Sequence, residues 1–104
     1  MLTKDHAMPE LSIFARITPL PEHRDAALSA LRSLLSPTRA EPGCLRFELN
    51  LGCGDDPSLY LIERWSDDAA LDRHYEQPYT ARVFAAYEDW LAEPVHVVKL
   101  RPQG

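Results

Sequence analysis

Four stretches of the chain show the alternation of apolar and polar residues, or the short apolar run, that is typical of β-strands. They cover residues 11–18, 44–51, 59–65 and 95–100. In the first stretch, one face carries Leu11, Ile13, Ala15 and Ile17. Each stretch has proline or glycine close to one of its ends, and these residues favour turns. The pattern therefore predicts four strands.

A different period follows the first strand. Residues 21–36 place apolar side chains on one stripe of a helix, namely Ala27, Leu28, Leu31, Leu34 and Leu35. Pro21 suits the first turn, and Pro37 is expected to end the helix because proline interrupts the hydrogen bonds of a helix interior.

The second helical region is predicted in two pieces. A short helix begins after Ser66, its expected N-cap, and Pro78 interrupts it. A longer piece covers residues 79–92 and ends before Pro94. The order strand, helix, strand, strand, helix, strand predicts an α+β ferredoxin-like sheet, βαββαβ, with the helices on one face.

The predicted sheet is apolar on both faces in its third and fourth strands. In the third strand, one face carries Leu59, Leu61 and Trp65, and the other carries Tyr60 and Ile62. In the fourth strand, one face carries Val95 and Val97, and the other carries Val98 and Leu100. In the second strand, Leu45, Phe47 and Leu49 are expected to face the helices, and Arg46, Glu48 and Asn50 to face away. A second copy of the sheet is the simplest cover for the outer face, which predicts a homodimer.

Length and charge narrow the class of protein. The 104 residues, 45% of them hydrophobic, fit one domain over 1–104, with a core at about 11–100, a flexible segment 1–9 and a tail 101–104. The net charge of −5 makes nucleic acid an unlikely partner. No apolar run approaches the ~20 residues that span a bilayer, so no membrane partner and a cytoplasmic location are expected.

Metals and cofactors are not expected from the sequence. Cys44 and Cys53 would lie about 30 Å apart along an extended strand, beyond the reach of a disulfide, and are interpreted as free thiols. His6, His23 and His96 have no companions at the spacing of metal ligands. The chain has no glycine-rich phosphate loop or dinucleotide motif.

Three segments together resemble the antibiotic biosynthesis monooxygenase domain, which includes bacterial quinol monooxygenases. They are EPGCLRFEL, LYLIERW and SDDAALDRHYEQPY, and the resemblance covers about residues 11–100. It implies a dimeric α/β barrel with one pocket per subunit between sheet and helices. It also implies oxygenation of a quinol or related aromatic by molecular oxygen without flavin, haem or metal. Such a site needs a base, a dry apolar cleft, and polar groups that hold the developing anion.

The resemblance nominates residues for these roles. His74 matches the helical histidine of the family, and histidine has a reference pKa of ~6.5, which suits a general base. Glu63 either orients His74 or forms a structural pair, and Trp65 is either a core residue or a wall that stacks on the substrate. The remaining candidates for substrate binding are apolar or aromatic: Phe14, Phe47, Leu61, Tyr75, Phe84 and Tyr87.

Other activities of similar proteins stay open or are disfavoured. The haem-degrading branch of the superfamily uses an asparagine on the first strand, where this chain has Phe14 and no asparagine within 11–18. Haem cleavage is therefore disfavoured. Two alternatives remain, a non-catalytic binding or stress-response module and an isomerase of a small keto sugar, because function depends on the site rather than on the fold.

Overall fold

A computed structural model describes residues 9–104, so all but the last residue of the predicted flexible segment 1–9, His6 included, lies outside the described part of the chain. Four strands form one sheet in the order β2-β3-β1-β4, in which every neighbouring pair is antiparallel. The strands are β1 (Leu11–Ile17), β2 (Cys44–Leu51), β3 (Leu59–Trp65) and β4 (His96–Leu100). The predicted α+β ferredoxin-like fold is confirmed.

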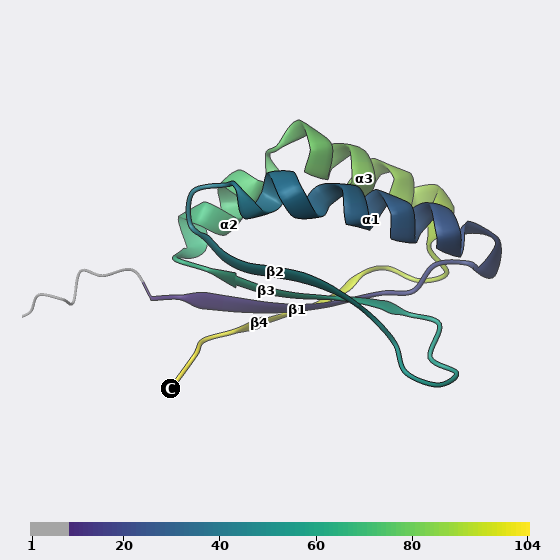
Figure 1. Ribbon diagram of the computed structural model, residues 1–104, viewed down its shortest axis with the longest axis horizontal. Coiled ribbons are helices and arrows are strands. Elements are labelled where there is room, and N and C mark those ends of the chain that lie inside the picture. Colours follow the sequence, from purple (N-terminus) through teal and green to yellow (C-terminus); the bar gives the residue numbers. More distant parts are fainter. Residues whose placement is uncertain (1–8) are drawn as a thin grey trace, which may run out of the picture.

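The helices all cover one face of this sheet (Figure 1). They are a short 3-10 turn η2 (Pro21–His23) followed by α1 (Arg24–Arg39), α2 (Asp68–Tyr75) and α3 (Pro78–Trp90). The core lies between the helices and the inner sheet face, where alternate residues of β1 and β3 are buried. Burial of each large apolar side chain contributes roughly 1.5–3 kcal/mol, so this alternation fixes which face of the sheet meets the helices.

Several predicted helix boundaries are wrong. Helix α1 begins at Arg24, after η2, rather than at residue 21, and α3 ends at Trp90 rather than at residue 92. Helix α1 continues through Pro37 to Arg39. Proline removes one hydrogen bond of the helix, and only Thr38 and Arg39 follow it, so little of α1 depends on that bond. The N-cap of α2 is Asp67 rather than Ser66, since the Asp67 carboxylate accepts a hydrogen bond of 2.8 Å from the Ala70 amide.

Strand β2 also departs from strict alternation. Cys44 pairs with Trp65 and Arg46 pairs with Arg64, so Leu45 is an extra residue in a bulge. Its side chain is 53% exposed, which contradicts its predicted place on the helix side. Phe47 is buried on that side as expected.

Gly43 holds the turn that precedes this bulge. Its φ of 87° lies in the left-handed region, and a Cβ atom there would come within 2.6 Å of Ala70 Cβ and 2.7 Å of Ser66 Oγ. Only glycine therefore lets the turn lie against the start of α2. The turn begins at Glu41, so its position matters to the site described below.

Replacing Gly43 by alanine should lower the free energy of unfolding by about 2 to 4 kcal/mol, through backbone strain and a clash with Ala70. Gly54→Ala is the matched control. Gly54 has a φ of 62°, but nothing lies within 4 Å of its added Cβ, so only the strain of roughly 1–2 kcal/mol is expected. Urea unfolding measures both, and equal losses would contradict the argument from the clash.

The outer face of the sheet carries a row of apolar side chains. Ile62, Phe14 and Val98 lie directly opposite one another across β3, β1 and β4. The rings of Phe14 and Tyr60 are 5.5 Å apart.

The predicted tail follows β4, and Arg101 donates hydrogen bonds to the carbonyls of Pro9 and Glu10. Of the helices within 9–104, none is long and apolar enough to cross a membrane.

Candidate active site

A small cavity lies between the inner sheet face and the helices, with a volume of about 40 Å³. It adjoins an open groove of about 330 Å³, and the two share a wall built from Tyr75, Phe84, Tyr87, Val95 and Val97. The inner cavity has room for a few water molecules, but not for an aromatic ring. We therefore interpret the groove as the mouth of the cavity. Of these two spaces, only the groove is large enough for the ring of a substrate.

Most of the predicted site residues meet here. The cavity is lined by Phe47, Leu61, Glu63, His74, Tyr75, Phe84 and Tyr87. Phe14 is separated from them, because it lies on the outer face of the sheet beside Tyr60. Its predicted place in the same cavity is wrong, since β1 presents Ile13 and Ala15, rather than Phe14, to the helices.

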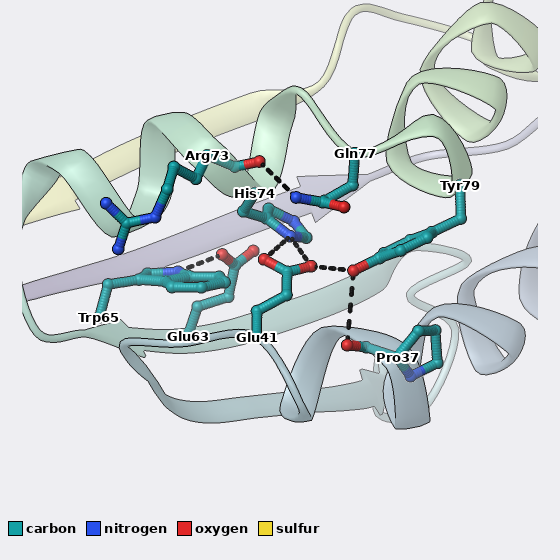
Figure 2. Close-up of polar contacts among 8 residues, drawn as sticks. All are labelled: Pro37, Glu41, Glu63, Trp65, Arg73, His74, Gln77 and Tyr79. Atoms are coloured by element: carbon teal, nitrogen blue, oxygen red, sulfur yellow. Dashed lines mark hydrogen bonds and ion pairs between the residues drawn. The ribbon is translucent and has the colours of Figure 1, made fainter.

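His74 lies in the last turn of α2, and its side chain is 4% exposed. Its Nδ1 atom is 3.2 and 3.1 Å from the two carboxylate oxygens of Glu41 (Figure 2). An ionised carboxylate only accepts hydrogen bonds, so Nδ1 carries the proton in this contact. In the neutral imidazole the nitrogen that is free to accept a proton is then Nε2.

Glu41 has a second donor in Tyr79. The hydroxyl of Tyr79 donates to Glu41 Oε2 and lies 3.4 Å from the carbonyl oxygen of Pro37 (Figure 2). Burial and the Glu41 carboxylate raise the pKa of Tyr79 to about 12, which keeps the phenol protonated as a donor. The side chain of Glu41 is 8% exposed, and a carboxylate this deeply buried requires such partners.

Glu63 is a second buried acid in the same site. It lies on the inner face of β3, where its Oε1 accepts a hydrogen bond of 2.9 Å from Trp65 Nε1. Burial raises the pKa of Glu63 to about 7, and the nearby charge of Glu41 adds to this effect, while the bond from Trp65 opposes it. The sequence left two roles open for Glu63, orientation of His74 or a structural pair, and the structure gives the contact with His74 Nδ1 to Glu41.

Aromatic rings hold His74 from two sides. The centroid of the His74 ring is 4.8 Å from that of Trp65 and 5.5 Å from that of Phe47. Trp65 is fully buried and does not line the cavity, so it supports His74 and Glu63 from behind rather than forming a wall. These contacts restrict the imidazole to one orientation.

A row of three aromatic rings forms the mouth. The rings of Tyr75 and Phe84 are 5.7 Å apart, and those of Phe84 and Tyr87 are 5.6 Å apart. Burial and the charge of Glu63 raise the pKa of Tyr75 to about 12 and raise the pKa of Tyr87 as well, so both phenols stay neutral. Phe84 is 43% exposed and borders the groove.

Three polar residues of the site were not found from the sequence. Glu41 was interpreted only as part of a turn, although the resemblance rested partly on its Glu-Pro-Gly motif. Tyr79 and Thr80 lie in the first turn of α3, and nothing in their local pattern marks them as polar groups of the site. Within residues 9–104, no group of three or more His, Cys, Asp or Glu side chains could hold a metal ion.

Comparison with known proteins identifies the family. Residues 11–86 match the family described as antibiotic biosynthesis monooxygenase. The chain is 35% identical over 92 residues to a Mycobacterium tuberculosis protein named "Putative monooxygenase Rv0793", covering 88% of this chain and 90% of that protein. The solved structure of Rv0793 matches with a TM-score of 0.87, 34% identity, and coverage of 91% of this chain and 96% of that one.

A second solved structure agrees. PA3566 from Pseudomonas aeruginosa matches with a TM-score of 0.87 and 36% identity, over 95% of this chain and 99% of that one. The family description and the name of the M. tuberculosis relative support a monooxygenase-like function. The matched residues include β1 to β3, α1, α2 and most of α3, and they contain both His74 in α2 and Glu41 in the turn between α1 and β2. The chain belongs to the antibiotic biosynthesis monooxygenase family.

Proposed function

We propose that this protein is a cofactor-independent monooxygenase that oxidises a quinol or related electron-rich aromatic with molecular oxygen. The observation that carries the proposal is His74, a buried imidazole whose Nδ1 is held by Glu41 and which lines a mainly apolar cavity. A proton-free Nε2 atom in such a position suits a general base.

In the proposed reaction, Nε2 of His74 takes a proton from a hydroxyl of the substrate. The resulting phenolate is electron-rich and transfers an electron to oxygen, and the two radicals then combine. One oxygen atom enters the ring and the other leaves as water. All four electrons come from the substrate, because a hydroquinone plus oxygen gives a hydroxyquinone plus water, so no further reductant is needed.

The groove fits an aromatic ring better than a sugar phosphate. Its walls are Tyr75, Phe84, Tyr87, Val95 and Val97, and no lysine or arginine is among the described residues that line the groove or the cavity. A phosphate group would need such cations or an equivalent set of donors. The ring would lie in the groove, with its reacting edge directed into the cavity.

Oxygen uptake with a panel of reduced naphthoquinones tests this function. The proposal requires consumption of one oxygen molecule per quinol and a hydroxylated quinone as product. Metal-free, flavin-free protein should show the same rate after treatment with a chelator. An enzyme that isomerises a sugar, or a protein that only binds an aromatic molecule, would consume no oxygen in this assay.

The proposed assembly is a homodimer in which two copies pack their outer sheet faces together. The paired row of Ile62, Phe14 and Val98 supplies the apolar centre of this face. A stable interface of this kind buries more than ~1,000 Å². Light scattering at micromolar concentration should give twice the mass of one chain, and Phe14→Glu should shift it towards the monomer. A monomeric mass for the unaltered protein would contradict the proposal.

A further inference from the structure

Two buried hydroxyl groups lack a hydrogen-bond partner within residues 9–104. They are Thr38 Oγ1 in α1 and Thr80 Oγ1 in α3, and both residues are fully inaccessible to solvent. An unpartnered buried hydroxyl costs about 1–3 kcal/mol, so its presence calls for an explanation. The two differ in one respect: Thr80 lines the inner cavity and Thr38 does not.

Thr80 also stands at the positive end of a helix. It is the third residue of α3, a helix of 13 residues with no acidic side chain in its first turn. The N-cap residue, Gln77, makes no capping hydrogen bond with its side chain. The first turn of such a helix favours negative charge, because its amide groups lack partners within the helix and the dipole is positive there.

We propose that Thr80, supported by the N-terminal end of α3, binds the substrate oxygen that becomes negatively charged when the hydroxyl loses its proton. The inference rests on the proposed function and names the class of substrate: a planar phenol or quinol whose hydroxyl enters the cavity while its ring lies in the groove. Thr80 is thus a substrate-binding residue. His74 removes the proton and Thr80 donates a hydrogen bond to the oxygen that remains.

The other groups of the cavity leave this role to Thr80. No lysine or arginine lines the cavity among the described residues, so once His74 has taken the proton its imidazolium is the one cation that lines the cavity there. Glu63 lines the same cavity, and in its protonated form it does not repel an anion. The inner cavity of about 40 Å³ has room for a hydroxyl group but not for an aromatic ring, whereas the groove of about 330 Å³ holds the apolar part of the molecule.

Binding of an inert phenol and of its methyl ether tests this inference. The probes are 4-nitrophenol and 4-nitroanisole, which differ in the hydroxyl, and the proteins are wild type, Thr80→Val and Thr38→Val. Valine keeps the shape of threonine and removes the hydroxyl. Wild type should bind the phenol ~10-fold more tightly than the ether, a typical effect of one hydrogen bond. Thr80→Val should reduce this preference to the part that His74 supplies, and Thr38→Val should keep it in full.

Two further measurements sharpen the result. The visible absorption of bound 4-nitrophenol reports its ionised fraction, which Thr80→Val should lower and Thr38→Val should not. Both variants remove an unpartnered hydroxyl, so both should melt at or above the wild-type temperature, which separates a binding defect from unfolding.

The outcomes also separate this inference from the proposed function. A preference in Thr80→Val equal to that of wild type, or no preference or no binding in wild type, would overturn the role of Thr80. Oxygen uptake with quinols in that case would still support the monooxygenase. Conversely, a preference that depends on Thr80, together with no oxygen uptake from any quinol, would uphold the binding site and overturn the proposed reaction.

Discussion

Replacing His74 by alanine should lower kcat/KM for the quinol by on the order of 10² to 10⁴, the usual contribution of a general base. The rate of the unaltered protein should also fall as the pH is lowered, because a protonated imidazole cannot accept the substrate proton. This acid limb should disappear in the variant. Steady-state oxygen uptake across a range of pH measures both effects.

Alanine at position 74 also leaves Glu41 with fewer donors, which lowers stability, so a second variant is needed. His74→Gln retains an amide that donates to Glu41, yet glutamine is not a base. It should stay folded by circular dichroism and lose activity nearly as much as His74→Ala. His23→Ala is the matched control, since His23 lies in η2 and lines neither the cavity nor the groove. Activity within a few-fold of wild type in folded His74→Gln would contradict the assignment.

The second large effect concerns the dependence of stability on pH. Burial raises the pKa of Glu63 from 4.5 to about 7, so the folded protein holds this proton more tightly than the unfolded chain does. The proton on Glu63 therefore stabilises the folded protein fully below about pH 4.5. This stabilisation is lost as the pH rises to about 7, and the free energy of unfolding changes little above that. The shift corresponds to about 3 kcal/mol in the free energy of unfolding.

Glu63→Gln should remove this dependence and keep an oxygen that accepts from Trp65. Relative to wild type, the variant should gain up to about 3 kcal/mol between pH 4.5 and pH 8, as measured by urea unfolding at several pH values. Glu48→Gln, on the outer face beside Arg46, is the control and should leave the wild-type dependence in place. A constant difference between Glu63→Gln and wild type at all pH values would show that Glu63 ionises normally in the folded protein.

The two variants also distinguish the two candidate bases of the site, His74 and Glu63. Glu63 titrates near neutral pH, where it could contribute to the acid limb of the rate. If His74 is the base, the acid limb persists in Glu63→Gln and is absent from His74→Gln. If the limb instead disappears with Glu63, that carboxylate becomes the better candidate for the base.

Much of the fold was predictable because the burial of one face of each strand or helix repeats apolar residues at a regular spacing along the sequence. The four strands were predicted within one residue at each end, since one face of each must meet the helices. The end of α1 was missed because proline was expected to stop the helix, whereas the penalty near a helix end is small. The bulge at Leu45 was missed because an extra residue interrupts the alternation without any glycine or proline inside the strand to mark it.

The site was only partly predictable for a different reason. His74, Glu63 and Trp65 were found through a motif, but the partner of His74 lies 33 residues away in a turn. Glu41 carries an ordinary turn signal, and only the folded structure shows its carboxylate to be buried. Thr80 has no signal at all, since a threonine in the first turn of a helix gives no indication of whether its hydroxyl will find a partner.

Because of the bulge in β2, the chain could lose one residue without any change in the strand pairs that follow the bulge. Cys44 pairs with Trp65 and Arg46 pairs with Arg64, and these two partners are consecutive residues of β3. A chain without Leu45 would therefore form the same pairs from Arg46 onwards. Bulges bend a strand and redirect what precedes it, and here the preceding segment is the turn that carries Glu41. A deletion of one residue at this point would therefore leave the buried face intact and move the acid away from the imidazole. A related protein with this single deletion would therefore keep the fold and lose the contact between Glu41 and His74.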